Sequence, residues 1–256
     1  MEQTNPSNSA KQDSLKAKAI AHIQNKLITG TLAWGSQVSE EAIAQEIGIS
    51  RTPVREALQV FTRLGIFQRI PRYGTIVREP DLQEIHELFE MRLALESYAV
   101  ESAAKSATTE SIARIEALCA ELKGIGKTMR TDGRSILNGD EIVRTLAADL
   151  DFHLEIIRSL GNSMMIRYLV DTNLLLRIFT ARRNKLFNLH YLAGVYGYHC
   201  RILRAIKHRD PVKAKDLVIE HIRYSETGAI ELMKELTAEA RRLRREAPKD
   251  EHLLLG

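Results

Sequence analysis

Four side chains in the second half of the chain have the types and spacing to bind one metal ion: Asp149, His153, His199 and His221. Asp149 and His153 are four residues apart in "DLDFHLEII", so they share one face if this segment is helical. The two later histidines lie 11 residues before and 11 residues after Asp210, which with Pro211 is typical of a turn that starts a new helix. An antiparallel helix pair about that turn would place both imidazoles roughly 16 Å from it, facing one another.

One carboxylate and three imidazoles suit a divalent metal, with zinc or nickel as the first candidates. The alternative is that these are scattered helix histidines, because the chain has eight and a plain polar or core role is commoner for any one of them. A bound metal could be structural, could itself be the signal, or could activate water as in a metal-dependent hydrolase. Against catalysis, no clear general base lies beside the proposed ligands, and Glu155 has no assigned direction. We therefore predict no catalytic residues.

Helical patterns would have to position these residues, and none of the chain after Leu82 has the alternation of a strand. The patterns run over residues 81–105, 109–130, 140–160, 163–186, 190–208 and 211–245. Between the second and third, the stretch "GKTMRTDGRSILNGD" is polar and contains glycine, which indicates a mobile loop. We expect an all-α antiparallel bundle over residues 82–240, followed by a charged, solvated tail over residues 241–256.

A second set of residues lies in "ISRTPVREAL", which begins a helix that Ser50 caps. A buried stripe is expected at helical spacing: Val54, Ala57, Leu58 and Phe61. Arg51 and Arg55 lie on a different face, with Thr52 beside Arg51. Arginine makes bidentate contacts with guanine or phosphate, and a helix N-terminus attracts anions. We expect this helix to enter the major groove of double-stranded DNA, although each arginine alone could be a solvated charge, with Arg55 paired to a nearby glutamate.

The elements around this helix have the order of a winged helix-turn-helix over residues 14–79. A helix over residues 14–30 precedes a turn and the short helix "EEAIAQEIG", and "IFQRIPRYGTIVRE" has the alternation of a small β-hairpin wing. Residues 1–13 are polar and are expected to be disordered. The first 80 residues hold ten basic and seven acidic side chains, so they carry +3 of the net charge of +4. The fold class is therefore mainly α, with the wing as its β component.

The composition is ordinary for a soluble protein of two domains, with 256 residues, 44% hydrophobic and 27% charged. Two cysteines far apart in the sequence indicate no disulfide framework and favour the cytoplasm. The chain has no apolar run long enough to span a membrane.

The stretch from residue 15 to 78 resembles the DNA-binding domain of the GntR family of bacterial transcription regulators. The resemblance rests on "SRTPVREAL", followed by "GIF", a proline and the wing glycine Gly74. It implies that Arg51, Thr52 and Arg55, together with Ser50, contact DNA, and that the wing around Tyr73 and Gly74 lies in or near the minor groove. Some members carry a DNA-contacting arginine where this chain has Glu41.

Residues 82–235 resemble the all-helical FCD ligand-binding domain of the FadR subfamily, through "MRLALESYAVESAA", "DLDFHLEIIRSLGN" and the His–hairpin–His ending. Metal-binding members place their ligands at the positions of Asp149, His153, His199 and His221. The resemblance implies a pocket with the metal at its floor and with effector-binding roles for Arg92, Glu96 and Asn162. The alternatives are a surface i,i+4 salt bridge between Arg92 and Glu96, and a helix-terminating role for Asn162. Tyr198 replaces the usual acidic residue before the first late histidine.

Together, the two resemblances imply a homodimeric regulator that senses a small carboxylate and binds a DNA operator, with repression as the first expectation. A dimer is expected because helix-turn-helix proteins read two half-sites related by a two-fold axis. The alternatives remain a metal-dependent hydrolase, or a regulator whose metal is structural or is itself the signal.

Overall fold

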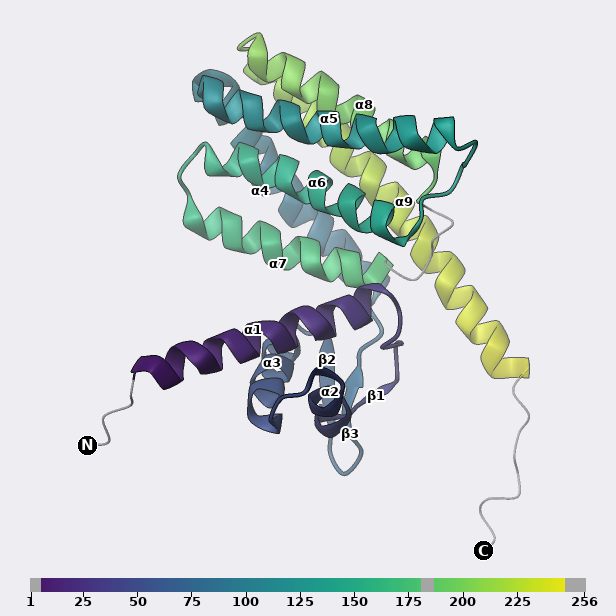
Figure 1. Cartoon of the computed structure of the whole chain (residues 1–256). Coiled ribbons are helices and arrows are strands. Elements are labelled where there is room, and N and C mark those ends of the chain that lie inside the picture. Colours follow the sequence, from purple (N-terminus) through teal and green to yellow (C-terminus); the bar gives the residue numbers. More distant parts are fainter. Residues whose placement is uncertain (1–5, 181–186, 247–256) are drawn as a thin grey trace, which may run out of the picture.

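The computed structural model describes residues 6–180 and 187–246, arranged as a small N-terminal domain below a larger helical bundle (Figure 1). The N-terminal domain contains α1 (Pro6–Ile28), β1 (Gln37–Val38), α2 (Glu40–Ile47), α3 (Arg51–Arg63), β2 (Phe67–Ile70) and β3 (Gly74–Val77). The bundle contains α4 (Leu82–Ser106), α5 (Thr109–Thr131), α6 (Gly139–Arg158), α7 (Ser163–Thr180), α8 (Leu189–Lys207) and α9 (Pro211–Glu246). This is the mainly α fold with a winged helix-turn-helix that the sequence predicts.

Capping residues set the boundaries of the helix-turn-helix. Ser39 accepts a hydrogen bond from the Ala42 amide at the start of α2, and Gly48 ends this helix with φ of 67°. Ser50 holds the N-cap position of α3, but among the described residues its side chain makes no capping hydrogen bond. The predicted apolar stripe of α3 is buried against α1 and the sheet.

The wing is one strand richer than predicted. The predicted hairpin is present as β2 and β3, and β1 pairs with the other edge of β3, which makes an antiparallel sheet of order β1-β3-β2. The sequence indicated only a turn at β1, because its two residues are too few to show alternation.

The predicted loop between the second and third bundle helices is much shorter in the structure. Helix α5 continues to Thr131, so the prediction of a mobile loop is wrong for residues 126–131. Two backbone hydrogen bonds attach the remaining turn to the start of α8, from Leu137 to the Phe187 carbonyl and from Leu189 to the Ser135 carbonyl. Asn138 and Glu141 form a capping box that begins α6.

Two predicted boundaries at the ends of the chain also change. Helix α1 begins at Pro6, so the prediction of disorder through residue 13 is wrong for residues 6–13. Helix α9 continues to Glu246, so the tail predicted from residue 241 begins as helix, and its remainder lies outside the described residues. Within the described ranges, no helix is both long and apolar enough to cross a membrane.

The core of the winged domain makes a direct test of this packing. Phe61 is fully buried on α3, and its ring centroid lies 5.5 Å from that of Phe67. Replacing Phe61 with Ala should destabilise the domain by about 3–5 kcal/mol, because it removes a buried ring and leaves a cavity. Urea unfolding followed by circular dichroism measures this, with the exposed neighbour Gln59→Ala as the control. Equal midpoints for the two variants would contradict the packing.

Candidate functional site

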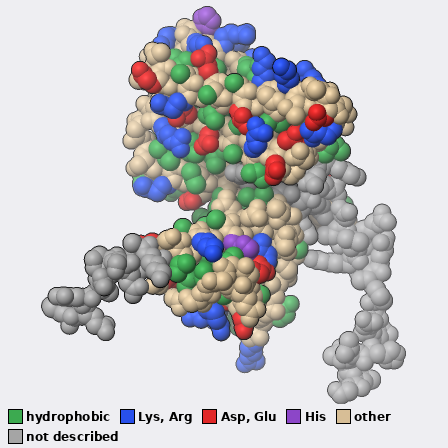
Figure 2. Space-filling model, in the orientation of Figure 1, with side chains coloured by type: hydrophobic (Ala, Val, Ile, Leu, Met, Phe, Trp, Pro, Cys, Tyr) green, Lys and Arg blue, Asp and Glu red, His purple; other side chains and the backbone are tan. Residues whose placement is uncertain are grey.

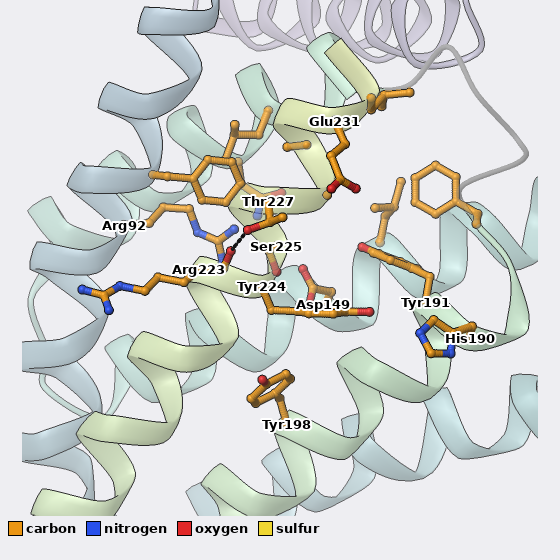
Figure 3. A pocket seen from close by; sticks show the side chains of 18 of the residues that line it. Arg92, Asp149, His190, Tyr191, Tyr198, Arg223, Tyr224, Ser225, Thr227 and Glu231 are labelled. Atoms are coloured by element: carbon orange, nitrogen blue, oxygen red, sulfur yellow. Dashed lines mark hydrogen bonds between the residues drawn. The ribbon is translucent and has the colours of Figure 1, made fainter. Parts of the chain in front are cut away.

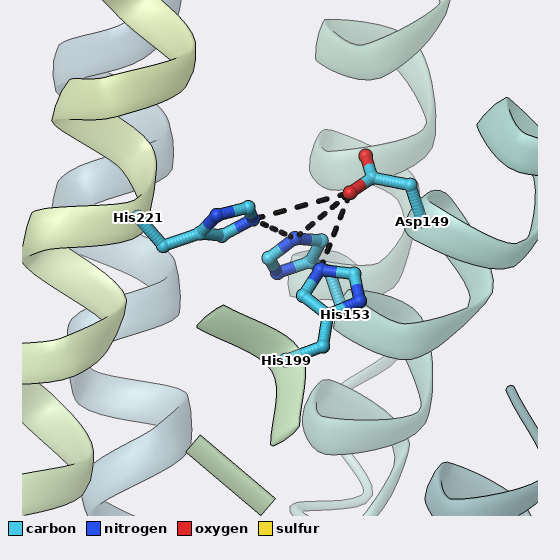
Figure 4. Close-up of side chains that lie close together, drawn as sticks. All are labelled: Asp149, His153, His199 and His221. Carbon is cyan, nitrogen blue, oxygen red and sulfur yellow. Dashed lines mark hydrogen bonds and ion pairs between the residues drawn. The ribbon is translucent and has the colours of Figure 1, made fainter. Parts of the chain in front are cut away.

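The four predicted ligands lie together in the middle of the bundle (Figure 4). Asp149 Oδ1 is 3.3 Å from His199 Nε2, 3.8 Å from His153 Nε2 and 3.9 Å from His221 Nε2. One potential ligand atom from each of the four residues lies within 4.8 Å of the others. All three imidazoles are at most 1% exposed.

Local helix geometry produces this convergence. Asp149 and His153 lie one turn apart on α6, as their spacing predicts. The turn between α8 and α9 is also as predicted: Asp210 accepts a hydrogen bond from the Lys213 amide at 2.9 Å, and Pro211 is the first residue of α9. The equal arms of this hairpin bring His199 and His221 to the same height, with their ring centroids 4.9 Å apart.

The donor atoms fit a divalent cation. The ring nitrogens that face Asp149 are the three Nε2 atoms, and among the described residues Nε2 of His199 is buried and makes no well-aligned hydrogen bond. Burial lowers the pKa of His199 and of His221, so both rings are neutral and can offer a lone pair. Burial alone would raise the pKa of Asp149, but the three histidines, His199 first, hold it well below its usual range. A carboxylate with neutral imidazoles is the set of ligands that zinc and similar ions take.

Two buried charged side chains lie in series behind His153, on the side away from Asp149. Arg92 Nε donates to Glu96 Oε1 at 2.7 Å, and Glu96 Oε2 lies 2.5 Å from His153 Nδ1. Burial would raise the pKa of Glu96, but Arg92 and His153 lower it to about 2, so this side chain is a carboxylate. Such a carboxylate behind a histidine fixes the ring so that its other nitrogen faces the metal position.

Arg92 and Glu96, which were expected to share one role, lie in different places in the structure. Their i,i+4 salt bridge is present, but it is buried rather than on the surface, with 4% of Arg92 and 2% of Glu96 exposed. Arg92 lines the main cavity of the bundle, whereas Glu96 lines a separate small crevice beside His153. The position of Glu96 does not support the prediction that it contacts an effector. Its carboxylate lies against His153 and can instead orient that ring.

The main cavity has a volume of about 750 Å³ and lies among α4, α6, α7, α8 and α9 (Figure 3). Asp149 joins it to the four-residue cluster, because its side chain belongs to both. Arg92 Nη2 is buried and has no hydrogen-bond partner within the described part of the chain. A buried donor left unsatisfied costs about 1–3 kcal/mol, so this guanidinium is well suited to bind an anionic ligand by donating to it.

Asn162 does not belong to the cavity. It is exposed in the turn before α7, where its side-chain oxygen accepts hydrogen bonds from the amides of Met164 and Met165, both at 3.1 Å. The prediction of effector binding is therefore wrong in position, and Asn162 caps the start of a helix.

Sequence reasoning missed several cavity residues, among them His190, Tyr191, Tyr224 and Glu231. Tyr224 packs directly against Gly194 of α8. A side chain at Gly194 would collide with it, because a Cβ there would lie 2.7 Å from the phenol oxygen of Tyr224. Their spacing from the metal-ligand candidates could have found them, because these residues lie on α8 and α9 within about three helical turns of His199 and His221.

The predicted DNA-facing residues are exposed on the winged domain. The side chains of Arg51 and Arg55 are 59% and 56% exposed, and both approach Glu40 of α2, Arg51 at 3.6 Å and Arg55 at 3.1 Å. The alternative of a glutamate partner is thus observed for both arginines. Exposed pairs of this kind contribute about 0–1 kcal/mol, so DNA phosphates can compete for them. Ser50 and Thr52 are exposed beside them.

The wing projects from the same domain. Tyr73 is 57% exposed, and its carbonyl accepts a hydrogen bond from Gln37 Nε2. Gly74 has φ of 114°, and a Cβ there would lie 2.8 Å from Gln37 Nε2, so this position favours glycine. Figure 2 shows Lys and Arg side chains at the end of the domain that points away from the bundle.

Comparison with known proteins accounts for both halves of this architecture. Residues 15–77 match the bacterial regulatory proteins of the gntR family, and residues 87–224 match the FCD domain. The chain belongs to the GntR family of transcription regulators that carry an FCD domain. Members of this family bind DNA operators and are regulators, not enzymes.

Individual relatives are distant. The HTH-type transcriptional regulator YdhC of Bacillus subtilis is 23% identical over 79% of this chain and 85% of its own length. The gluconate operon transcriptional repressor of Bacillus licheniformis is 26% identical over 60% of this chain and 58% of its own length. Among solved structures, E. coli McbR/YncC superposes with a TM-score of 0.67 at 19% identity, covering 87% of this chain and 98% of that one. The structural likeness establishes the fold.

The carboxylate behind His153 gives a test of the metal cluster. Replacing Glu96 with Gln should weaken zinc binding by roughly 10–100-fold, because the ring of His153 loses its charged partner. Competitive titration of the purified protein with a zinc chelator measures this, and Glu90→Gln, exposed on the same helix, is the control. Unchanged zinc affinity in the Glu96 variant would contradict the positioning role.

Proposed function

We propose that this GntR-family protein is a homodimeric repressor whose affinity for its operator is set by a small carboxylate bound in the bundle cavity. The observation that carries the proposal is the unpaired Nη2 of buried Arg92 in the same cavity that Asp149 lines. A carboxylate there would satisfy the guanidinium beside the metal cluster. Relatives named as repressors of a gluconate operon and of a D-xylose utilization operon support repression.

Asp149, His153, His199 and His221 would hold a divalent cation, with zinc or nickel as the first candidates. When bound, such an ion supplies a positive charge and open coordination positions for an oxygen of the effector. Arg92 binds and orients the carboxylate, and Glu96 holds Arg92 and His153 in place. No catalytic residue is proposed. The hydrolase alternative has no support from the relatives, which are regulators.

Helix α4 offers a route from the cavity to the DNA-binding domain, because it carries Arg92 and begins directly after the wing. Arg78, at the end of the wing, pairs with Glu84 in the first turn of α4 at 2.6 Å. The same guanidinium donates to the carbonyl of Gly65, just after α3. We infer that a movement of α4 is transmitted to the recognition helix through Arg78. An effector can drive this only if it binds one arrangement more tightly than the other.

Dimerisation follows from the way helix-turn-helix proteins read two half-sites. Tyr73 and Gly74 of the wing are proposed to approach the minor groove, while Ser50, Arg51, Thr52 and Arg55 contact the major groove or its phosphates. A regulator of this kind acts on the chromosome, so we propose a cytoplasmic location.

Arg51→Ala should weaken binding to the preferred operator by about 1–3 kcal/mol and relax sequence discrimination, if its guanidinium reads a base. The operator is first obtained by selecting tight-binding sequences from a random DNA library with the wild-type protein. Fluorescence anisotropy then compares the variant with Arg63→Ala, an exposed arginine at the other end of α3. If the Arg51→Ala variant binds the operator with wild-type affinity and selectivity, the proposal that α3 reads the DNA through Arg51 is wrong.

The effector site is tested by a thermal-shift screen of zinc-loaded protein against small organic acids. A ligand that binds the folded state must raise the melting temperature. The shift should disappear in Arg92→Lys, which keeps the charge beside Glu96 but loses the planar fork that matches a carboxylate. Arg114→Lys, which alters an exposed partner of Glu155, is the control. A shift of equal size in both variants would rule out Arg92 as the carboxylate site.

The same screen separates the roles of the metal. Removing zinc with a chelator should leave the bundle folded but abolish the thermal shift by the acid, if the metal belongs to the sensing site. Loss of the circular-dichroism transition of the bundle on chelation would instead favour a structural ion.

A further inference from the structure

The cavity changes from polar to apolar in steps of one helical turn. On α4 the order is Glu96, Arg92 and then Phe89, and on α6 it is His153, Asp149 and then Leu146. Each step of three or four residues is roughly 5 Å along the helix. The two helices therefore share three levels: the metal cluster with its support, a charged level, and an apolar level. Phe89 is 3% exposed and Leu146 is 9% exposed.

Helix α9 completes the same levels while running in the opposite direction. Beyond His221, the cavity-lining residues on α9 include Ser225, Ala229 and Leu232, in that order. Ala229 and Leu232 are 8% and 1% exposed, so this end of the cavity is lined by buried apolar side chains from three helices. Burial of apolar ligand surface against such a wall is favourable, and a purely hydrophilic ligand would gain nothing from it.

The apolar end also carries one negative charge. Glu231 lines the cavity next to Leu232, and its side chain is exposed to solvent (Figure 3). Its charge repels a second anionic group that reaches this end, and because Glu231 is exposed, solvent screening keeps this repulsion modest. The two ends of the cavity are therefore distinguished by both polarity and charge: Arg92 favours one carboxylate, and Glu231 disfavours another.

From this layering, and resting on the carboxylate site proposed above, we infer that the effector is a monocarboxylate with an apolar tail. Its carboxylate meets Arg92, and its chain or ring lies among Phe89, Leu146, Ala229 and Leu232. Short hydroxylated acids lack the tail, and long dicarboxylates place a second charge beside Glu231. A cavity of about 750 Å³ has room for such a ligand, since drug-sized molecules occupy sites of roughly 300–1,000 Å³.

The test is isothermal titration of zinc-loaded, full-length protein with butanoate, hexanoate and octanoate, with gluconate as the hydroxylated comparison. Each buried methylene should tighten binding by about fourfold, so hexanoate should bind roughly fifteenfold more tightly than butanoate. Octanedioate should bind at least about tenfold more weakly than octanoate, because its second carboxylate would leave water for the apolar end of the cavity, with the repulsion by Glu231 as a smaller addition. Equal affinities across the series, or gluconate binding most tightly, would overturn the apolar-tail inference.

A pair of variants isolates the charge at the apolar end. Glu231→Gln should bring the affinity for octanedioate closer to that for octanoate, because the repulsion is removed. Glu235→Gln, one turn further along α9 and outside the cavity lining, should leave both affinities unchanged. The same small change in both variants would show that Glu231 does not face the bound tail, and would overturn its role.

The failure of this inference and the failure of the proposed function look different. If gluconate or butanoate binds as tightly as octanoate and Arg92→Lys abolishes that binding, the carboxylate site stands and the apolar tail is wrong. If Arg92→Lys binds every acid as the wild-type protein does, the carboxylate site itself is wrong and the inference falls with it.

Discussion

The bundle depends on the buried chain from Arg92 through Glu96 to His153. Removing charges from water is costly, and a buried arginine is tolerated only when an opposite charge and further hydrogen bonds compensate it. Glu96 provides that charge, and its second oxygen lies against His153. One carboxylate thereby connects the cavity side chain that would bind an anion with the ring that would bind a metal. Without Glu96, the guanidinium of Arg92 would be left as an uncompensated buried charge.

The position of this chain also determines what the rest of the bundle must supply. His153 brings α6 close to α4, and the remaining two imidazoles come from one hairpin, α8 and α9, whose arms have equal length about Asp210. Residues one and two turns away from the cluster on α4, α6 and α9 also line the cavity, so they form its successive levels. Polarity therefore varies along the helix axes, and a ligand bound there would be held in one orientation.

The connection between the two domains is short and charged. Arg78 lies between the end of α3 and the first turn of α4, so the recognition helix and the cavity helix share one side chain. In the proposed mechanism, this side chain would couple the two sites through a rigid element rather than through a long series of contacts. Under the same proposal, a ligand in the bundle would act on the winged domain by favouring one of two positions of α4.

The sequence by itself determined much of this protein, because local rules apply to its most informative segments. The apolar stripe of α3, the helical spacing of Asp149 and His153, and the Asp210–Pro211 turn each depend on residues within one or two turns, and all three are present in the structure. The resemblance to the FCD domain pointed to Arg92 and Glu96, and their i,i+4 spacing allowed a salt bridge, but the spacing could not tell a surface salt bridge from a buried one. Burial is a property of the neighbouring helices, and it was the packing of α4 against α9 and α6 that decided it. The same reason explains the other errors: β1 is stabilised by its partner strand, the turn before α6 by hydrogen bonds to the start of α8, and the levels of the cavity by the relative height of helices that are far apart in the sequence.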